Sequence, residues 1–259
     1  MNHSPTLVFG DDGSPAADIA WLFINSQRWP GWSIEIVTAH MPDALGTALP
    51  AEDVQLHPWT PPTPRTKFGE AGFTHISQLT AESDPRLVLS RECDLLVIGP
   101  HGNGFLKAMH IGSTADWLML RPPAPLLVAR HGKQVQTVVV CADGSSHADL
   151  AIATVAALPF AAQLSVTVLT VDDGRVDTDA VLREATAKLE PTVAKVDQQG
   201  ITGKPTAIIY EYLETAKPDL VALGTRGLTG LKHLRLGSTA TAIARSTDCS
   251  VLLTSAADC

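Results

Sequence analysis

Short apolar runs alternate along the chain with longer stretches in which apolar residues recur at helical spacing. Several runs consist almost wholly of valine, leucine and isoleucine, which is typical of parallel strands covered on both faces. Strands that alternate with helices indicate crossover connections, and hence an α/β fold with a doubly wound parallel sheet. The predicted strands span 6–9, 33–39, 73–78, 95–99 and 125–129 in the first half, and 137–141, 164–171, 192–197, 220–224 and 250–254 in the second.

Serine residues mark where several helices are expected to begin. Ser14 and Ser145 follow the first predicted strand of each half, and Ser113 and Ser238 follow the fourth. A serine at a helix start accepts a hydrogen bond from a free backbone amide. We therefore expect each of these serines to cap a helix.

The second half of the chain repeats the first. Asp-Leu-Leu-Val-Ile-Gly-Pro-His-Gly (94–102) matches Asp-Leu-Val-Ala-Leu-Gly-Thr-Arg-Gly (219–227), and a Gly-Ser-Thr-Ala follows each at the same offset of 125 residues. Upstream, Asp-Gly-Ser at 12–14 matches Asp-Gly-Ser at 143–145, an offset of 131. A repeat of this length is a whole domain. The sequence therefore predicts two tandem domains, 1–132 and 133–259.

The two copies differ between these motifs. The offset falls by six, so the first copy carries a net insertion, which we assign to the proline-rich stretch 56–64. Proline lacks an amide donor and clashes with the preceding helical turn, so this stretch is not an ordinary helix. In the second copy, 176–190 predicts a helix with Val181, Leu182, Ala185 and Leu189 on one face.

Composition restricts the class of function. The 259 residues are 45% hydrophobic and 18% charged, as expected for a globular protein with a substantial core. The net charge of −8 argues against non-specific binding to nucleic acid or anionic membrane. No apolar run approaches the roughly 20 residues that span a bilayer, and the first residues do not resemble a signal peptide. The four cysteines form no CxxC pair, which favours reduced thiols in a cytoplasmic protein.

Both copies contain the pattern G-x2-G-x9-G-S-T. The first uses Gly99, Gly102, Gly112, Ser113 and Thr114, and the second uses Gly224, Gly227, Gly237, Ser238 and Thr239. A glycine that ends a buried strand permits a sharp turn and leaves room for a ligand above the sheet. The last glycine and the Ser-Thr pair open a helix, whose free amides and dipole suit a phosphate. The intervening loops carry Lys107 and Lys232.

Asp12 and Asp143 each follow the first strand of a copy. A carboxylate there accepts hydrogen bonds from ribose hydroxyls or from the adenine amino group, although helix capping without a ligand explains either aspartate alone. The repetition of this aspartate beside a repeated phosphate-type loop favours nucleotide binding. The GxxxxGK[ST] pattern is absent, as is a GxGxxG after the first strand.

Together, Asp-Gly-Ser after the first strand and the glycine pattern after the fourth resemble the ATP-binding branch of the universal stress proteins. The resemblance covers nearly the whole chain twice and is weakest around 42–72. It implies two five-stranded parallel sheets in order 3-2-1-4-5 and binding of ATP, AMP or ADP, with or without Mg²⁺. A backbone group of Ala39 or Val171 and the aspartate would contact the adenosine, while the glycines and Ser113 or Ser238 would contact phosphates and ribose.

The resemblance also implies how the domains assemble. Domains of this family pair through their last strands, so 126–129 and 251–254 are expected to pair within one chain and bury two open edges. The result is a pseudo-dimer inside the chain, and a homodimer of whole chains is a further assembly that the resemblance allows.

The first copy departs from the family pattern. Asp11 precedes Asp12 where an apolar residue is usual, and this charge would weaken nucleotide binding if it faced the site. Pro100 replaces a small residue, and the second helix is expected to be lost. We therefore expect the second copy to be the better nucleotide site.

Three functions remain open at this point. The first is a nucleotide-binding regulatory or stress-response module without efficient catalysis, since the motifs supply no convincing nucleophile, base or metal cage. The second is an enzyme that cleaves ATP or transfers adenylate, for which the nearby groups are His101, Lys107, Lys232 and His233. The third is a nucleotide-free scaffold in which the motifs persist only as turns.

Overall fold

The computed structural model describes residues 4–41, 62–66, 68–100, 112–227 and 236–256. The first half contains β1 (Thr6–Gly10), α1 (Pro15–Ser26), β2 (Ser33–His40), β3 (His75–Glu82), α2 (Pro85–Leu89), β4 (Leu95–Ile98), α3 (Ser113–Leu120) and β5 (Leu126–Val128). The second half contains β6 (Thr137–Cys141), α4 (Ser146–Ala157), a short 3-10 helix (Ala161–Gln163), β7 (Ser165–Asp172), α5 (Thr178–Leu189), β8 (Lys195–Thr202), α6 (Pro205–Ala216), β9 (Leu220–Gly224), α7 (Ser238–Ser246) and β10 (Ser250–Thr254).

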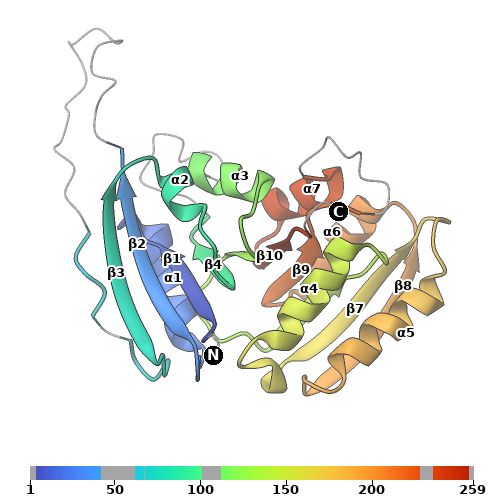
Figure 1. Cartoon of the computed structure of the whole chain (residues 1–259). Helices are drawn as coiled ribbons and strands as arrows, with labels where there is room; N and C mark the ends of the chain where they lie inside the picture. Colours follow the sequence, from blue (N-terminus) through green and yellow to red (C-terminus); the bar gives the residue numbers. More distant parts are fainter. Residues whose placement is uncertain (1–3, 42–61, 67, 101–111, 228–235, 257–259) are drawn as a thin grey trace, which may run out of the picture.

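The strands form one ten-stranded sheet in the order β3-β2-β1-β4-β5-β10-β9-β6-β7-β8 (Figure 1). Each half has the order 3-2-1-4-5, and every pairing within a half is parallel. The predicted fold class is therefore confirmed for both copies. The boundary between residues 132 and 133 stays a prediction, and it lies in the connection from β5 to β6.

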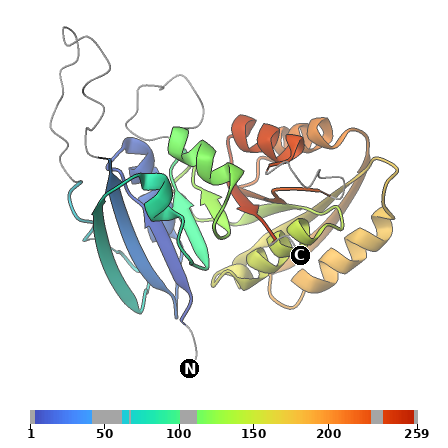
Figure 2. The ribbon, with the colours of Figure 1, turned by 45° about the horizontal axis from the view of Figure 1, so that its top comes forward.

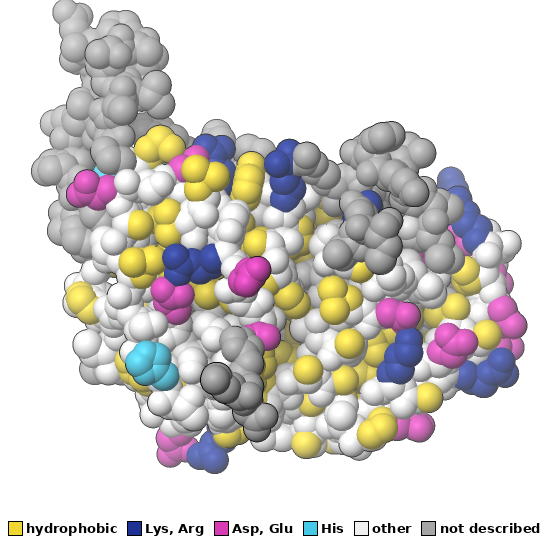
Figure 3. All heavy atoms as spheres, in the orientation of Figure 1, with side chains coloured by type: hydrophobic (Ala, Val, Ile, Leu, Met, Phe, Trp, Pro, Cys, Tyr) yellow, Lys and Arg dark blue, Asp and Glu magenta, His cyan; other side chains and the backbone are white. Residues whose placement is uncertain are grey.

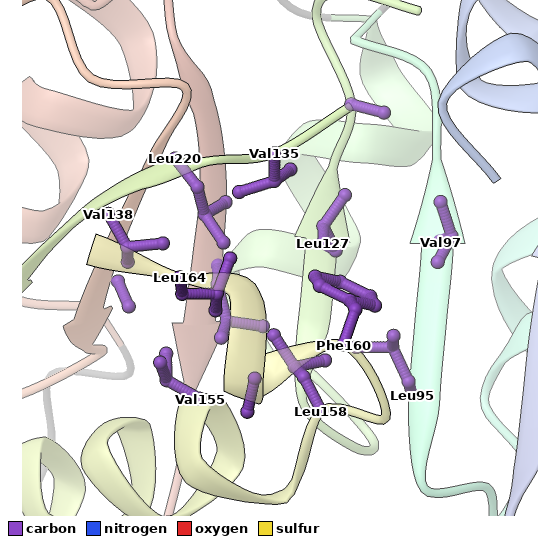
Figure 4. Close-up of a cluster of buried hydrophobic side chains, with 14 of the residues drawn as sticks. Leu95, Val97, Leu127, Val135, Val138, Val155, Leu158, Phe160, Leu164 and Leu220 are labelled. Atoms are coloured by element: carbon purple, nitrogen blue, oxygen red, sulfur yellow. The ribbon is translucent and has the colours of Figure 1, made fainter. Parts of the chain in front are cut away.

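The two halves meet through β5 and β10, which pair antiparallel with Leu127 opposite Leu252. Both leucines are completely buried. Around them lies a core to which both halves contribute, as Figure 4 shows for Leu95 and Val97 beside Leu158 and Phe160. Because each last strand would otherwise be an open edge, this pairing closes two edges at once.

Helices cover both faces of the sheet (Figures 1 and 2). Residues of α1, α4 and α5 belong to one hydrophobic cluster, whereas residues of α2, α3, α6 and α7 belong to the other. Among the described residues, no helix is long and apolar enough to cross a membrane. On the face seen in Figure 3, acidic and basic side chains are interspersed rather than gathered by sign.

The net insertion predicted for the first copy is the sum of one longer connection and one shorter connection. Between β2 and β3 the first copy has 34 residues (41–74), whereas the second has 22 (173–194) between β7 and β8. After the third strand the first copy is shorter, because α2 has five residues and α6 has twelve. The predicted helix of the second copy is α5, with Leu182, Ala185 and Leu189 buried. Within 62–66 and 68–74 of the first copy no helix replaces it.

The expected helix caps are confirmed after the first strands and wrong after the fourth. Ser14 and Ser145 accept hydrogen bonds from the amides of Ala17 and Ala148 at 3.1 and 3.2 Å. At α3 and α7 the capping residue is instead the preceding glycine, without any side-chain cap. Ser113 and Ser238 are thus the first helical residues, and their hydroxyls do not serve as caps.

The two edge strands were predicted about three residues too early. The predictions were 73–78 and 192–197, whereas β3 and β8 span 75–82 and 195–202. Both strands are rich in polar residues, and five of the eight residues in each strand are exposed. An edge strand buries little, so its hydrophobic pattern marks its limits poorly.

Candidate functional site

A cavity of about 320 Å³ lies at the carboxyl ends of β6, β7 and β9 in the second copy. β6 and β9 are neighbours in the sheet although β7 follows β6 in the chain, so this is the point at which the strand order reverses. Parallel α/β sheets bind ligands at such points. All seven site residues predicted for the second copy line this one cavity: Asp143, Val171, Gly224, Gly227, Gly237, Ser238 and Thr239.

Asp143 is held by the turn that follows β6. Its Oδ1 atom accepts a hydrogen bond from the amide of Ser145 at 3.0 Å, and Gly144 provides the positive φ of 76° that the turn requires. The other oxygen lies against Gly227, where an added Cβ would come within 2.5 Å of it. The absence of a side chain at Gly227 therefore lets the backbone approach the Asp143 carboxylate.

Gly224 and Gly99 each make room for a neighbouring helix. A Cβ on Gly224 would lie 2.6 Å from the Cβ of His147, and one on Gly99 would lie 2.6 Å from the carbonyl of Ala16. The space that the missing side chain leaves is thus taken by the start of the first helix of each copy. Gly224 also lines the cavity, so the expectation that this glycine leaves room for a ligand stays a prediction.

The start of α7 forms one end of the cavity. The amide of Gly237 donates to the carbonyl of Thr225 at 2.7 Å, which brings the helix start against the end of β9. Ser238 is exposed, and the Thr239 hydroxyl lies 3.0 Å from that of Thr206 on α6. Free amides and the helix dipole at this end attract an anion.

Val171 presents backbone groups at the other end. The carbonyl of Leu169 accepts from the amide of Ala142 at 3.0 Å, and the carbonyl of Asp172 accepts from Gly203 at 3.0 Å on the opposite side. Since the direction of backbone groups alternates along a strand, the amide and carbonyl of Val171 point like those of Leu169. They face the crevice beyond the end of β6, with one donor beside one acceptor.

Apolar side chains from several elements also line the cavity. They include Cys141, Val176, Pro205, Ile209 and Leu223. Burial raises the pKa of the Cys141 thiol to about 12, so it stays protonated at neutral pH. A flat apolar ring fits such a surface, whereas a strongly hydrated group does not.

Sequence reasoning missed several residues that line the cavity. Arg226 lies between Gly224 and Gly227 and lines the cavity. Its place within the glycine pattern could have identified it from the sequence. Arg175 and Asp173 follow β7 and approach each other within 3.4 Å. Pro205 and Ile209 come from α6, and no local pattern placed that helix over the site.

The corresponding residues of the first copy have the same places in their half of the sheet. Ala39 is in β2, Gly99 follows β4, and Asp12 is exposed after β1. Gly112 donates to the carbonyl of Pro100 at 2.8 Å, as Gly237 does to Thr225, and Ser113 and Thr114 open α3. Gly102 lies outside the described residues, as do Lys107, Lys232 and the two candidate histidines 101 and 233.

Asp11 is buried and neutralised rather than directed into an open site. Arg65 grips both of its oxygens at 2.7 and 2.8 Å and also reaches Asp18 of α1 at 2.6 Å. Hydrogen bonds to Asp11 raise the pKa of Arg65 although its burial acts in the opposite direction. In the second copy, Ala142 takes the place of Asp11, and Lys188 of α5 reaches Asp149 at 2.7 Å.

The first turns of α3 and α7 differ in charge. The first turn of α3 contains Asp116, which is paired with Arg245 of α7. The matching position of α7 is Thr241, whose hydroxyl donates to the carbonyl of Gly237 at 2.9 Å. The first copy thus has a carboxylate near its helix start and the second does not.

The model of the universal stress protein family matches residues 72–130 and 176–255, which is more than half of the chain. The chain therefore belongs to the universal stress protein family. It is 28% identical over 168 residues to universal stress protein Slr1230 of Synechocystis sp., an alignment that covers 63% of this chain and 58% of the relative. It is 33% identical over 72 residues to universal stress protein MJ0531 of Methanocaldococcus jannaschii, which covers 28% and 42%.

The chain thus matches less than two thirds of the length of either curated relative. Among solved structures, a universal stress protein from Archaeoglobus fulgidus superposes with a TM-score of 0.67 at 17% identity, over 98% of this chain and 99% of that one. At this identity the likeness establishes a shared fold for the whole chain.

Proposed function

We propose that the second copy binds an adenine nucleotide, namely ATP or its products ADP and AMP, and that the chain is a regulatory stress-response module without efficient catalysis. One observation carries this proposal. A single cavity contains a helix start suited to phosphate, a carboxylate suited to ribose, and a backbone donor–acceptor pair beside an apolar surface.

In this arrangement the phosphates bind at the start of α7, where Gly237, Ser238 and Thr239 lie. Arg226 adds positive charge there. The ribose hydroxyls donate to Asp143. The adenine lies on the apolar surface, where its amino group donates to the Val171 carbonyl and its N1 accepts from the Val171 amide. Guanine presents the reverse pattern and would leave both backbone groups unpaired, which disfavours it.

Magnesium, where it takes part, is expected to arrive with the phosphates. Among the described residues, no group of three or more histidine, cysteine or acidic side chains is arranged to hold a metal ion. Titration of ATP with and without Mg²⁺ measures its contribution.

We further propose that the second copy is the stronger site, since Asp116 stands at the helix start of the first copy and Thr241 at that of the second. A Cβ on Gly237 would lie 3.3 Å from the Thr225 carbonyl. Gly237→Ala is therefore expected to weaken ATP binding about tenfold by calorimetric titration, while Gly112→Ala changes it little. A larger loss from the Gly112 change would overturn this assignment.

The first measurement is nucleotide analysis of purified protein. Denatured protein is expected to release an adenine nucleotide at about one per chain, identified by chromatography and mass spectrometry. Protein that is empty and does not gain thermal stability with ATP and Mg²⁺ would refute nucleotide binding and favour the scaffold. ATP turnover well above that of the Gly112→Ala/Gly237→Ala variant would instead favour an enzyme.

A further inference from the structure

His147, the second residue of α4, connects the C-terminal end of the chain to the nucleotide cavity. Its Nδ1 atom accepts a hydrogen bond from the amide of Ala256 at 3.0 Å. The same Nδ1 lies 3.3 Å from the hydroxyl of Thr225, which lines the cavity. The hydroxyl of Thr254, the last residue of β10, donates to the His147 carbonyl at 2.8 Å.

These contacts define the state of the imidazole. A backbone amide is only a donor, so Nδ1 must be the acceptor and the ring proton must be on Nε2. The Thr225 hydroxyl lies 3.3 Å from the same nitrogen, whose single lone pair the Ala256 amide already uses, so the hydroxyl contact is the weaker of the two. His147, Thr225 and Thr254 are all buried, and a buried polar group that loses its partner is costly.

Backbone hydrogen bonds of Thr225 link His147 to the start of α7, where the phosphates are proposed to bind. Its amide donates to the carbonyl of Thr254 at 2.8 Å, and its carbonyl accepts from the amide of Gly237 at 2.7 Å. The residue that opens α7 is thus two hydrogen-bonded steps from His147. The close packing of His147 on Gly224 holds the end of β9 at the same point.

The first copy has no equivalent of this connection. At the repeat offset of 131, Ala16 takes the place of His147, and at the offset of 125, Pro100 takes the place of Thr225. Neither side chain forms hydrogen bonds. Any coupling through these contacts therefore belongs to the second copy.

We propose that His147 is a positioning residue that couples nucleotide binding in the second copy to the order of the chain's C-terminal end at Ala256. This inference rests on the proposed nucleotide site. Binding at the start of α7 favours the contacts that the structure shows between Thr225 and His147, in which Nδ1 of His147 accepts from the Ala256 amide. Because coupling between two sites is reciprocal, release of Ala256 weakens nucleotide binding by the same factor.

The test compares three substitutions of one residue in the full chain. His147→Ala removes the acceptor and is expected to raise the dissociation constant for ATP about tenfold, within the usual range of coupling. His147→Asn places an amide oxygen where Nδ1 was and is expected to restore affinity to within about twofold. His147→Gln places its polar group near Nε2 instead and is expected to resemble alanine. His131→Ala, which removes a contact of 2.7 Å with the Asp219 carbonyl at the other end of β9, is the control and should leave affinity unchanged.

Hydrogen exchange of the Ala256 amide provides a second readout. In the unmodified chain, saturating ATP is expected to slow this exchange about tenfold, and His147→Ala should abolish the effect. The coupling would be refuted if all three variants bound ATP with equal affinity, or if ATP left the exchange rate of the Ala256 amide unchanged. Either result would leave the proposed nucleotide site intact. Failure of the unmodified chain to bind ATP would refute the proposed function and this inference with it.

Discussion

The buried pair of Asp11 and Arg65 shows how a single residue changes the meaning of a motif. Asp11 sits beside Asp12, for which we predicted a nucleotide contact, yet Asp11 is 3% exposed and both of its oxygens are bound by one guanidinium. The guanidinium carbon also lies 5.9 Å from the centre of the Trp21 ring. The charge therefore holds residues 62–66 against the first helix in place of the α5 helix that the second copy has.

Loss of Arg65 alone is expected to destabilise the fold strongly. Arg65→Met leaves Asp11 as a buried unpaired charge, which costs about 3–5 kcal/mol in the free energy of unfolding. Adding Asp11→Ala, the residue that the second copy has, should recover most of that loss. Urea unfolding of both variants measures this, and a double variant as unstable as Arg65→Met would show that the pair is not the cause.

Asp219 predicts a specific dependence of stability on pH. Burial alone would raise the pKa of Asp219, but hydrogen bonds from Lys133, Thr137 and Gln136 outweigh it and lower the pKa to about 2. The folded pKa is below the unfolded value of about 3.9, so the carboxylate stabilises the fold above pH 4 and this contribution is lost as the pH falls towards 2.

The stability difference between the unmodified chain and Asp219→Asn should therefore shrink by about 2 kcal/mol between pH 6 and pH 2. Urea unfolding at the two pH values, each carried out on both proteins, measures it. A difference that does not change with pH would mean that Asp219 titrates normally.

At the scale of elements, the antiparallel pair β5–β10 holds the two copies together. Leu127 lies at its centre opposite Leu252, within a core that includes Trp29 and Phe160, whose rings are 5.4 Å apart. Trp29 follows α1 and Phe160 follows α4, so side chains from both copies complete this joint. The core around the β5–β10 pair therefore requires residues of both copies.

Truncation at this joint is expected to be costly. Leu127→Ala should lower the free energy of unfolding by about 2–5 kcal/mol, because it leaves a cavity in a core that cannot collapse. The control is Leu87→Ala on α2, where the leucine is 67% exposed and the loss should stay within about 0.5 kcal/mol. Equal losses in urea unfolding would show that the joint contributes no special stability.

At the scale of the whole molecule, one continuous sheet and a core to which both halves contribute predict that the two copies unfold as a single cooperative unit. The sequence provides a direct probe, because all five tryptophans lie at positions 21–117, in the first copy. Tryptophan fluorescence therefore reports unfolding of the first copy, whereas circular dichroism reports helices of both. Coincident transitions are the mark of two-state unfolding.

Nucleotide bound in the second copy should then protect the first. At one hundred times the dissociation constant, ATP is expected to stabilise the chain by about 2.7 kcal/mol and to raise the fluorescence-detected melting temperature accordingly. Circular dichroism should show the same shift. The copies would unfold independently if ATP left the fluorescence-detected melting temperature unchanged but raised that of a separate transition detected by circular dichroism.

Much of this architecture followed from the sequence because it depends on local pattern and repetition. Apolar runs of four to eight residues marked the interior strands, and the repeat at 125 and 131 residues marked two copies of one fold. The glycine pattern of the second copy and Asp143 marked a common site, and these second-copy residues do line one cavity. Their role in binding stays a prediction until nucleotide is measured.

Only the tertiary structure decided features that depend on residues far apart in the chain. Asp11 is neutralised by Arg65, 54 positions later, and His147 receives the amide of Ala256, 109 positions later. Gly224 is glycine because a helix start presses against it, and Arg226 and α6 complete a cavity that local periodicity does not reveal. The hydrophobic pattern of the sequence indicates which face of a helix or strand is buried. Which residues contact that face depends on how the helices and strands pack in the tertiary structure.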